Sequence, residues 1–395
     1  MEHVADTFDL AEVSSAIRGC LPKDRASFEL HEPWFNGNEK RYVDECIETG
    51  WVSSLGKFVD TLERKLEEFT GVQKAFALVN GTSALHMALK MTDVDFNDEV
   101  LVPDLTFVAT ANAVSYCGAI PHFVDSETRT LGMDAAKLEG WLAEISQMKN
   151  GACFNKKTGR RIQAMVPMHT FGHPVDMDAL AIVGRKYNIA LIEDAAQSLG
   201  SFYKGKHTGH GGRLAILSFN GNKICSTGGG GAILTNDASL GQLTKHIATT
   251  AKLPHPWAFE HDHIGYNYRM PNINAALGVA QLEQLPDFLK RKRALAMRYR
   301  EAFSKVSGVR FFEEPDFAKS NYWLNVILLD EEAKEKRDDL LNFLVSQGIK
   351  ARPAWKLMHK LAMYQDCPRM DVSVAENLEA RLVNIPSSAF LGDES

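Results

Sequence analysis

Two short segments of the sequence carry residues that could do covalent chemistry. The first is S-F-N-G-N-K-I-C-S-T-G-G-G-G, residues 218–231, in which Lys223 lies on a loop that follows an apolar run. The second is I-E-D-A-A-Q, residues 192–197, in which Asp194 ends another apolar run. A lysine forms an imine only through its deprotonated amine, and burial beside a glycine-rich turn would lower its pKa. A carboxylate at the end of a buried strand needs a cationic partner to offset its desolvation.

These requirements are typical of proteins that bind pyridoxal 5'-phosphate (PLP). That cofactor is held through a Schiff base to a lysine, and a carboxylate keeps its pyridine nitrogen protonated so that the ring acts as an electron sink. Each residue alone has an ordinary alternative: Lys223 as a solvated surface lysine, and Asp194 as the cap of a helix that begins at Ala195. The presence of both favours the cofactor.

A third segment, N-G-T-S-A-L-H at residues 80–86, could bind a phosphate. It places small residues where a strand gives way to a helix, so that free backbone N–H groups point outward. The hydroxyls of Thr82 and Ser83 could add donors, and Ser218 is a further candidate. The alternative is a plain helix cap.

Phe107, His169 and the loop at residues 50–57 could also face a ligand. Phe107 in L-T-F-V-A-T could lie flat over a ring, and His169 lies in M-H-T-F-G; either could instead be a core residue. The loop reads G-W-V-S-S-L-G-K and is polar enough to contact a ligand. No metal site is expected, because the thirteen histidines show no H-E-x-x-H pattern and no pairing with cysteine.

Composition excludes several classes of protein. The chain has 395 residues, of which 45% are hydrophobic and 24% charged, which is ordinary globular usage. A net charge of -6 argues against a nucleic-acid partner. The six cysteines have no C-x-x-C spacing and the N-terminus has neither a basic nor an apolar signal region, so a cytoplasmic location is expected. No apolar stretch approaches the roughly 18 residues of a membrane span, so no membrane contact is expected.

From residue 75 onward, short apolar runs alternate with helical patterns. The predicted strands are A-F-A-L-V-N, E-V-L-V-P, A-I-P-H-F-V-D, A-M-V-P-M, A-L-I-E-D, A-I-L-S-F and G-A-I-L-T. This alternation predicts an α/β fold with a mostly parallel central sheet covered on both faces. Ligands bind beyond the carboxyl ends of such strands. Five polar residues are expected to converge there: Asn80, Asp104, His169, Asp194 and Ser218.

Three parts of the chain are predicted. They are a helical extension at residues 1–30, a large α/β domain at residues 31–270, and a linking helix with a small α+β domain at residues 271–395. Further elements are expected as two helices within residues 36–69, a long helix at residues 273–303, a strand at residues 322–329 and a helix at residues 334–347.

The chain resembles the sugar-nucleotide aminotransferases of the DegT/DnrJ/EryC1/StrS family, which are PLP enzymes of aminotransferase fold type I. The resemblance runs from about Glu32 to Pro386. It rests on an ordered set of motifs: N-G-T-S-A-L-H, P-D-L-T-F-V-A-T, E-D-A-A-Q-S-L-G, S-F-N-G-N-K, G-Y-N-Y-R-M and A-R-P-A-W-K-L-M-H. It implies PLP as cofactor, with pyridoxamine 5'-phosphate as its second form, and an obligate homodimer with shared active sites.

The resemblance assigns a role to each matching residue. Lys223 would form the Schiff base, Asp194 would pair with the pyridine nitrogen, and Gln197 would contact the 3-hydroxyl group of the ring. The remaining cofactor contacts would be Phe107 on the ring, Thr82, Ser83 and Ser218 on the phosphate, and Asn267 on the phosphate of the neighbouring subunit. Predicted substrate contacts are Ser53, His169, Tyr268, Arg269 and His359.

Within the family, three segments are most similar to the aminotransferases of legionaminic-acid and related bacterial glycan routes: W-F-N-G-N-E-K, G-W-V-S-S-L-G-K-F-V and M-H-T-F-G-H-P. The implied reaction moves an amino group from L-glutamate to C4 of a UDP-linked 4-keto-6-deoxy-N-acetylhexosamine, for surface glycans such as lipopolysaccharide. Three alternatives stay open: a 3-keto-sugar aminotransferase or lyase, an aminotransferase for a GDP-linked 4-keto sugar, and a PLP-binding regulator without catalysis.

One departure from the family pattern lies after the lysine. Many members read G-E-G-G there, whereas this chain reads G-G-G-G at residues 228–231. The missing acid is not one of the cofactor contacts, so it affects only the placement of the substrate. A branch of the family that catalyses dehydration has histidine in place of the lysine, and Lys223 argues against that branch.

Overall fold

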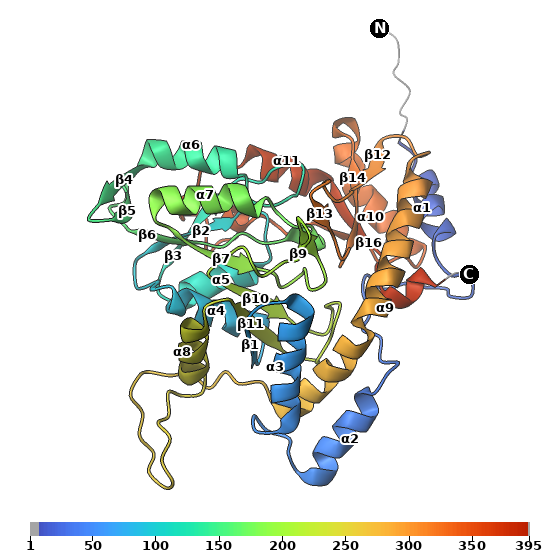
Figure 1. Cartoon of the computed structure of the whole chain (residues 1–395). Coiled ribbons are helices and arrows are strands. Elements are labelled where there is room, and N and C mark those ends of the chain that lie inside the picture. The colour runs from blue at the N-terminus through green and yellow to red at the C-terminus, as the bar shows by residue number, and fades with distance from the viewer. Residues whose placement is uncertain (1–7, 394–395) are drawn as a thin grey trace.

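The protein, described at residues 8–393 by a computed structural model, is built around a seven-stranded sheet (Figure 1). Its strand order is β1 (Lys74–Leu78), β11 (Gly231–Thr235), β10 (Leu214–Ser218), β7 (Ala190–Asp194), β6 (Ile162–Met165), β2 (Glu99–Pro103) and β3 (Ile120–Val124). Strand β11 is antiparallel to both neighbours, and every other adjacent pair is parallel. Most residues of these strands are buried, as in sheets covered on both faces. The predicted α/β fold with a mostly parallel sheet is confirmed.

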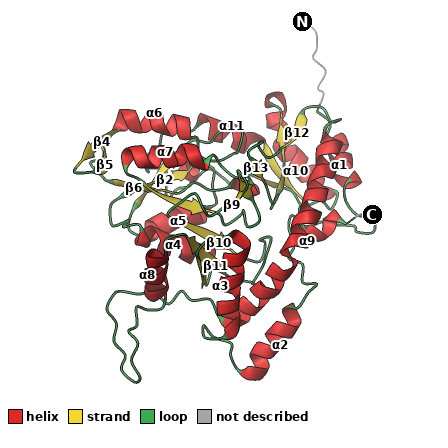
Figure 2. Ribbon diagram, viewed as in Figure 1, coloured by secondary structure: helices red, strands yellow, loops and turns green. Residues whose placement is uncertain are grey.

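Helices cover both faces of this sheet (Figures 1 and 2). One face packs against α4 (Gly81–Met91), α5 (Val108–Tyr116) and α8 (Ala238–Ala248). The other face packs against α3 (Lys57–Thr70), α6 (Ala135–Ile145), α7 (Met177–Tyr187) and the first turns of α9 (Asn272–Phe303). Helix α2 (Glu39–Thr49) lies against α9, and Trp51 to Gly56 form the predicted loop between α2 and α3. A two-stranded hairpin, β4 (Ser146–Lys149) and β5 (Ala152–Asn155), extends beyond α6.

A smaller antiparallel sheet forms from the C-terminal part of the chain. Its strand order is β12 (Val309–Phe311), β14 (Asn325–Leu329), β16 (Leu382–Ile385) and β15 (Arg352–Pro353), and it packs with α10 (Arg337–Ser346) and α11 (Ser373–Arg381). Helix α1 (Leu10–Gly19) shares the core of this part, and Phe28 pairs with Ile349 at its edge. Residues 8–30 of the predicted N-terminal extension therefore pack on the C-terminal part, and residues 1–7 of it lie outside the described residues. The division of the chain at residues 30 and 270 stays a prediction.

Minor elements connect the two parts. Strand β13 (Ala318–Lys319) pairs with β8 (Phe202–Tyr203), which pairs with β9 (Lys206–His207). Short 3-10 helices lie at Thr170–Gly172, Glu331–Lys336, Met358–Lys360 and Ala389–Gly392. Within the described residues, no helix is both long enough and apolar enough to cross a membrane.

Two predicted elements begin later than expected. The strand predicted at residues 322–329 begins at Asn325, because Tyr322 has a φ of 48°, which is outside the extended region. The helix predicted at residues 334–347 is α-helical only over Arg337–Ser346, and a 3-10 turn precedes it. The predicted long helix after residue 271 is confirmed as α9.

Helix α9 buries a lysine where it passes the small sheet. The side chain of Lys292 is fully buried, and its ammonium group donates to the backbone carbonyls of Trp323 and Ser387. Burial lowers the pKa of Lys292 to about 7, and no acid among residues 8–393 opposes that effect. The lysine ties α9 to the end of the small sheet where β14 begins and β16 ends, but carries a cost in stability when it is protonated.

Replacing this lysine by methionine tests that cost. Between the folded pKa of about 7 and the unfolded pKa of about 10.4, the unfolded chain binds more protons, so the contribution of Lys292 to folding stability rises with pH. We expect the stability difference between wild type and Lys292→Met to shift in favour of wild type by roughly 2 kcal/mol from about pH 6.5 to about pH 8.5. Denaturant unfolding at both pH values measures it. A difference that does not vary with pH would show that Lys292 does not titrate in this range.

Candidate active site

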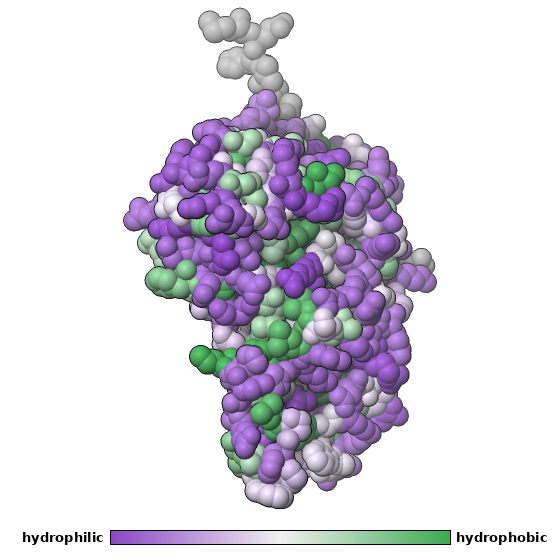
Figure 3. All heavy atoms as spheres, turned by 60° about the vertical axis from the view of Figure 1, so that its left-hand side comes forward, coloured by the Kyte–Doolittle hydropathy of each residue, from purple (hydrophilic) through white to green (hydrophobic). Residues whose placement is uncertain are grey.

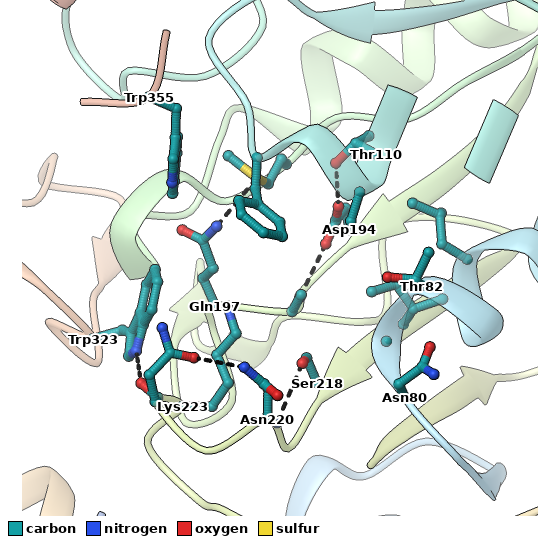
Figure 4. A pocket seen from close by; sticks show the side chains of 18 residues that line it. Asn80, Thr82, Thr110, Asp194, Gln197, Ser218, Asn220, Lys223, Trp323 and Trp355 are labelled. Atoms are coloured by element: carbon teal, nitrogen blue, oxygen red, sulfur yellow. Dashed lines mark hydrogen bonds between the residues drawn. The ribbon is translucent and has the colours of Figure 1, made fainter. Parts of the chain in front are cut away.

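A cavity of about 290 Å³ opens at the carboxyl ends of β7 and β10. Asn80 and Thr82 lie on one side of it, Trp323 and Trp355 lie on the opposite side, and Asp194 and Gln197 lie between them (Figure 4). Lys223 and Ser218 complete its lower wall. The cavity therefore draws on the large sheet for its polar groups and on the C-terminal part of the chain for its aromatic wall.

The N-terminus of α4 forms one end of the cavity. Asn80 caps the helix by accepting a hydrogen bond from the Ser83 N–H at 2.7 Å, which leaves the N–H groups of Gly81 and Thr82 without an intrahelical partner. A side chain at Gly81 would lie 2.9 Å from Cβ of Ser218, so glycine is what allows the helix to approach that serine. Helix N-termini of this kind bind anions, and the Ser218 hydroxyl adds a donor.

The glycine run after the lysine loop supports this helix terminus. Gly231 begins the antiparallel strand β11, so it lies at the same edge as the carboxyl ends of β1 and β10. A Cβ at Gly231 would lie 2.5 Å from the carbonyl carbon of Asn80, closer than real contacts allow. Gly231 thus packs behind the turn at Asn80, whereas the sequence predicts the glycine run beside Lys223.

Asp194 ends β7 at the floor of the cavity. One carboxylate oxygen accepts from the Ala196 N–H at 3.1 Å and the other from the Thr110 hydroxyl at 3.0 Å. Burial raises the pKa of the Asp194 carboxyl, although both hydrogen bonds and the positive charge of Lys223 oppose that effect. No helix begins at Ala195, directly after Asp194, which excludes the helix-cap alternative. A cation bound above this carboxylate would stabilise its charged form.

Lys223 lies on a turn between β10 and β11. Burial lowers the pKa of its amine to about 8, although Asp194 raises it. The turn is shaped by Asn220, whose amide donates to Asn222 at 3.2 Å. The ammonium nitrogen lies 4.0 Å from the centre of the Trp323 ring. The amine therefore loses its proton at a lower pH than an exposed lysine does, which favours imine formation.

Gln197 presents its amide NH2 group as a donor. Its Oε1 must accept from the backbone N–H of Phe171, 2.8 Å away, because that N–H can only donate. Nε2 then points to Met168 Sδ at 3.3 Å and to the cavity that both residues line. Phe171 has a left-handed φ of 56°, which is unusual for a bulky residue, and its ring packs 4.8 Å from that of Trp355.

These residues fit PLP. The α4 terminus with Ser218 would hold its phosphate, Asp194 would face its pyridine nitrogen, the Gln197 NH2 would face its 3-oxygen, and Lys223 would reach its carbonyl carbon. Phe107 lines the cavity and is half exposed, as a ring-stacking residue would be. The fit rests on the donor and acceptor character of groups that converge on one cavity.

Other predicted site residues lie elsewhere. Of the five polar residues expected at one edge of the sheet, Asp104 and His169 do not reach the cavity. His169 is fully buried: Nε2 bonds Glu193 at 2.7 Å and Nδ1 accepts from the Val175 N–H. The expectation that His169 contacts substrate is therefore not supported, and its alternative as a core residue describes it. Asp104 is likewise buried and bonded to Nδ1 of His359 at 2.5 Å.

The remaining predicted residues do not line the cavity. Ser53 is exposed on the loop before α3, Tyr268 bonds His86 at 3.1 Å, and Arg269 pairs with Leu78 at the end of β1. Ser83 is the third residue of α4. Asn267 is exposed and does not line the cavity of its own chain. The roles predicted for these residues stay predictions.

Sequence reasoning missed several residues of the cavity. They are Thr110, Met168, Asn220, Asn222, Trp323 and Trp355. Thr110 lies one turn after Phe107 in a segment already singled out, so its hydroxyl could have been noticed. The two tryptophans come from far along the chain, and no local pattern connects them to Lys223.

The chain is similar to several proteins of known type. The DegT/DnrJ/EryC1/StrS aminotransferase family matches residues 35–395. GDP-perosamine synthase of Escherichia coli O157:H7 is 37% identical over 92% of this chain and 94% of its own length. GDP-perosamine synthase of Caulobacter vibrioides is 36% identical over 93% of this chain and 95% of its own length. Among solved structures, Helicobacter pylori PseC, an aminotransferase involved in the biosynthesis of pseudoaminic acid, has a TM-score of 0.83 to this chain. Its sequence is 25% identical, and the match covers 92% of this chain and 94% of PseC.

Adding a methyl group at Gly231 tests the anion site. We expect Gly231→Ala to destabilise the fold by about 1 to 3 kcal/mol and to weaken PLP binding, because the new Cβ would push the Asn80 turn out of place. Gly221→Ala is a matched control on the lysine loop, where an added Cβ meets nothing within 4 Å. Thermal unfolding and titration with PLP measure both effects. Equal PLP affinity in the two variants would contradict the role of Gly231 in supporting the site.

Proposed function

The chain belongs to the DegT/DnrJ/EryC1/StrS aminotransferase family, and we propose that it transfers the amino group of L-glutamate to C4 of a nucleotide-linked 4-keto-6-deoxy-N-acetylhexosamine, with UDP as the nucleotide. It is a PLP-dependent sugar aminotransferase. The convergence of Lys223, Asp194 and the α4 terminus on one cavity carries the catalytic part of the proposal. The product would serve bacterial surface glycans, as in the legionaminic-acid routes.

The residues of the chain divide the work between them. PLP, when bound, supplies an electron sink that stabilises the carbanion formed at the donor or acceptor carbon. Asp194 would keep the ring nitrogen of PLP protonated, and the Gln197 NH2 group would donate to its 3-oxygen. Lys223, once its nitrogen is free, moves the proton between the substrate carbon and the cofactor carbon, for which a pKa of about 8 is well matched.

The size of the cavity bears on the substrate. At about 290 Å³ it is at the small end of ligand sites, so a nucleotide sugar must extend past the mouth. Ser53, Tyr268, Arg269 and His359 do not line the cavity, and we propose that they contact the nucleotide rather than the keto group. The alternative substrate, a GDP-linked 4-keto sugar, is favoured by the GDP-perosamine synthases among the relatives.

A panel of substrates decides between these two. We expect the UDP-linked 4-keto-6-deoxy-N-acetylhexosamine to be aminated when L-glutamate is the donor. Mass spectrometry of the sugar nucleotide measures the product. The matched controls are the GDP-linked 4-keto-6-deoxyhexose and a UDP-linked 3-keto isomer. Preferential amination of the GDP sugar would replace our substrate with that of the perosamine synthases, and amination of the 3-keto sugar would move the reaction from C4. If glutamate fails to convert bound PLP at all, the regulator alternative would hold.

We further propose that the active enzyme is a homodimer with shared sites. Large hydrophobic side chains are exposed on the α2–α3 loop and on the long loop after α8, including Trp51, Leu55, Trp257, Phe259 and Ile264. Hydrophobic residues also gather across the middle of one face, between hydrophilic regions above and below (Figure 3). Exposed apolar groups of this size favour a protein partner. Asn267 follows the second of these loops and is exposed, as a residue that reaches a neighbouring site must be.

Neutralising Asp194 tests its pairing with the ring nitrogen. We expect Asp194→Asn to keep the fold and most of the PLP affinity but to lose on the order of 100-fold or more in the rate of the glutamate half-reaction, because the charge that holds the proton is gone. Thr110→Val is the control, since it removes a hydrogen bond to this carboxylate but keeps the charge. Single-turnover absorbance measures the rate. A normal rate in Asp194→Asn would mean that another group protonates the ring.

Mixing two inactive variants tests the shared site. Lys223→Ala lacks the imine-forming amine, and Asn267→Asp places a negative charge against the neighbour's phosphate. In a mixed dimer one site carries both defects and the other neither, so we expect partial activity to return. Subunit exchange must first be shown with tagged chains. Exchange without any return of activity would place Asn267 in its own subunit's site, or in none.

A further inference from the structure

We propose that Trp323 is the residue that holds Lys223 as an ammonium ion whenever the lysine is not bonded to the cofactor. Trp323 is then a positioning residue: it acts on the reaction through the lysine. The inference rests on Lys223 being the cofactor lysine of the proposed function, and it is independent of which sugar nucleotide is the substrate.

The ring of Trp323 is the one partner of the free amine within the described part of the chain. Nζ of Lys223 lies 4.0 Å from the ring centre, within the range of a cation–π contact. Among the described residues, no hydrogen bond or ion pair reaches this nitrogen, although Asp194 lies on the same cavity. The negative face of an indole attracts an ammonium ion and not a neutral amine. The contact therefore favours the protonated state of the lysine.

Trp323 itself is fixed on every side. Its indole N–H donates to the carbonyl of Asn222 at 2.8 Å, and Asn222 directly precedes Lys223. Its backbone N–H donates to Oδ1 of Asn321 at 2.7 Å, and its carbonyl accepts from the buried Lys292 at 3.1 Å. Because the indole holds the turn on which the lysine lies, the ring and the amine keep their relative position. The side chain of Trp323 is nearly fully buried, so the ring is not free to move away.

The groups around Lys223 leave a place for such a contact. Burial disfavours the ammonium ion, and Asp194 from β7 favours it. His31, from the segment before α2, is the other titratable group that senses Lys223; burial and the charges of Lys292 and Lys223 hold the pKa of His31 well below its usual range, so it stays neutral. If Asp194 pairs with the ring nitrogen of the cofactor, its negative charge is partly neutralised, so it attracts the Lys223 ammonium ion less strongly. The Trp323 ring then becomes the main group that stabilises the proton on Nζ.

This arrangement has a consequence for the reaction. A lysine that shuttles a proton must first take it and then keep it until the second carbon is in place. A fully desolvated amine would release the proton too easily, and a salt bridge would retain it too strongly. The π face of Trp323 gives an intermediate stabilisation and lies beside the cavity, so the lysine returns to the substrate by a change of rotamer.

Fluorinated tryptophan tests the contact without altering the shape of the site. Each fluorine weakens the negative face of the indole while its size and N–H donor stay nearly the same. We expect the pH midpoint for covalent capture of PLP by the cofactor-free protein, followed by absorbance, to fall in steps with fluorination, by about half a pH unit in total. The chain has six tryptophans, so all six are replaced together. Trp323→Phe, labelled in the same way, is the control and should show no steps.

Each outcome has a distinct meaning. Steps in the wild-type background that vanish in Trp323→Phe support the proposal. If the pH midpoint for PLP capture does not change with fluorination, or if the steps persist in Trp323→Phe, the proposal is wrong. Covalent capture of PLP by Lys223→Ala would instead refute the assignment of the cofactor lysine, and so separates failure of the proposed function from failure of this inference. Circular dichroism confirms that the variants are folded.

Discussion

The burial of an acid and an amine in one cavity, without a bond between them, is the constraint on which the rest of the site depends. Burial raises the pKa of Asp194 and lowers that of Lys223, so both groups are drawn toward their neutral forms. A direct salt bridge would relieve both but would leave the amine unreactive. The chain instead supports each separately, the acid by Thr110 and the Ala196 N–H, and the amine by Trp323. A cofactor with a cationic nitrogen and a carbonyl group matches both needs together.

The sheet topology delivers these groups to one place. Strands β7 and β10 are parallel, so Asp194 and Ser218 leave the sheet at the same edge. Strand β11 runs the other way, and for that reason Gly231 begins where its neighbours end. The α4 terminus can then approach Ser218 only because Gly81 and Gly231 lack side chains. The anion site is thus a result of strand direction and of two glycines, in addition to the donors themselves.

The C-terminal part of the chain closes the site and fixes its aromatic wall. Trp355 packs against Phe171, which has a left-handed backbone conformation. The backbone N–H of Phe171 donates to Gln197 and so orients its amide. The ammonium group of Lys292 in α9 donates to the backbone carbonyl of Trp323, and this contact requires a buried lysine. A polar group placed at this depth links the long helix, the small sheet and the lysine turn. The cavity therefore depends on contacts between the two parts of the chain, and either part alone would leave it open.

The sequence by itself determined the fold class, the elements of the large sheet and the reactive residues. Apolar runs that alternate with helical patterns require a covered parallel sheet, and Lys223, Asp194, Gln197, Thr82, Ser218 and Phe107 are all found on one cavity. Local patterns could not show what these residues meet. His169 follows a strand as Asp194 does, yet its ring is turned into the core by Glu193, and only packing decides that direction. Trp323 lies 100 residues beyond Lys223, and its place over the amine comes from the docking of one sheet against another. Residue type and spacing fix which chemistry is available to a chain, whereas the partners that tune each group come from contacts distant in sequence, which arise only when the chain is folded.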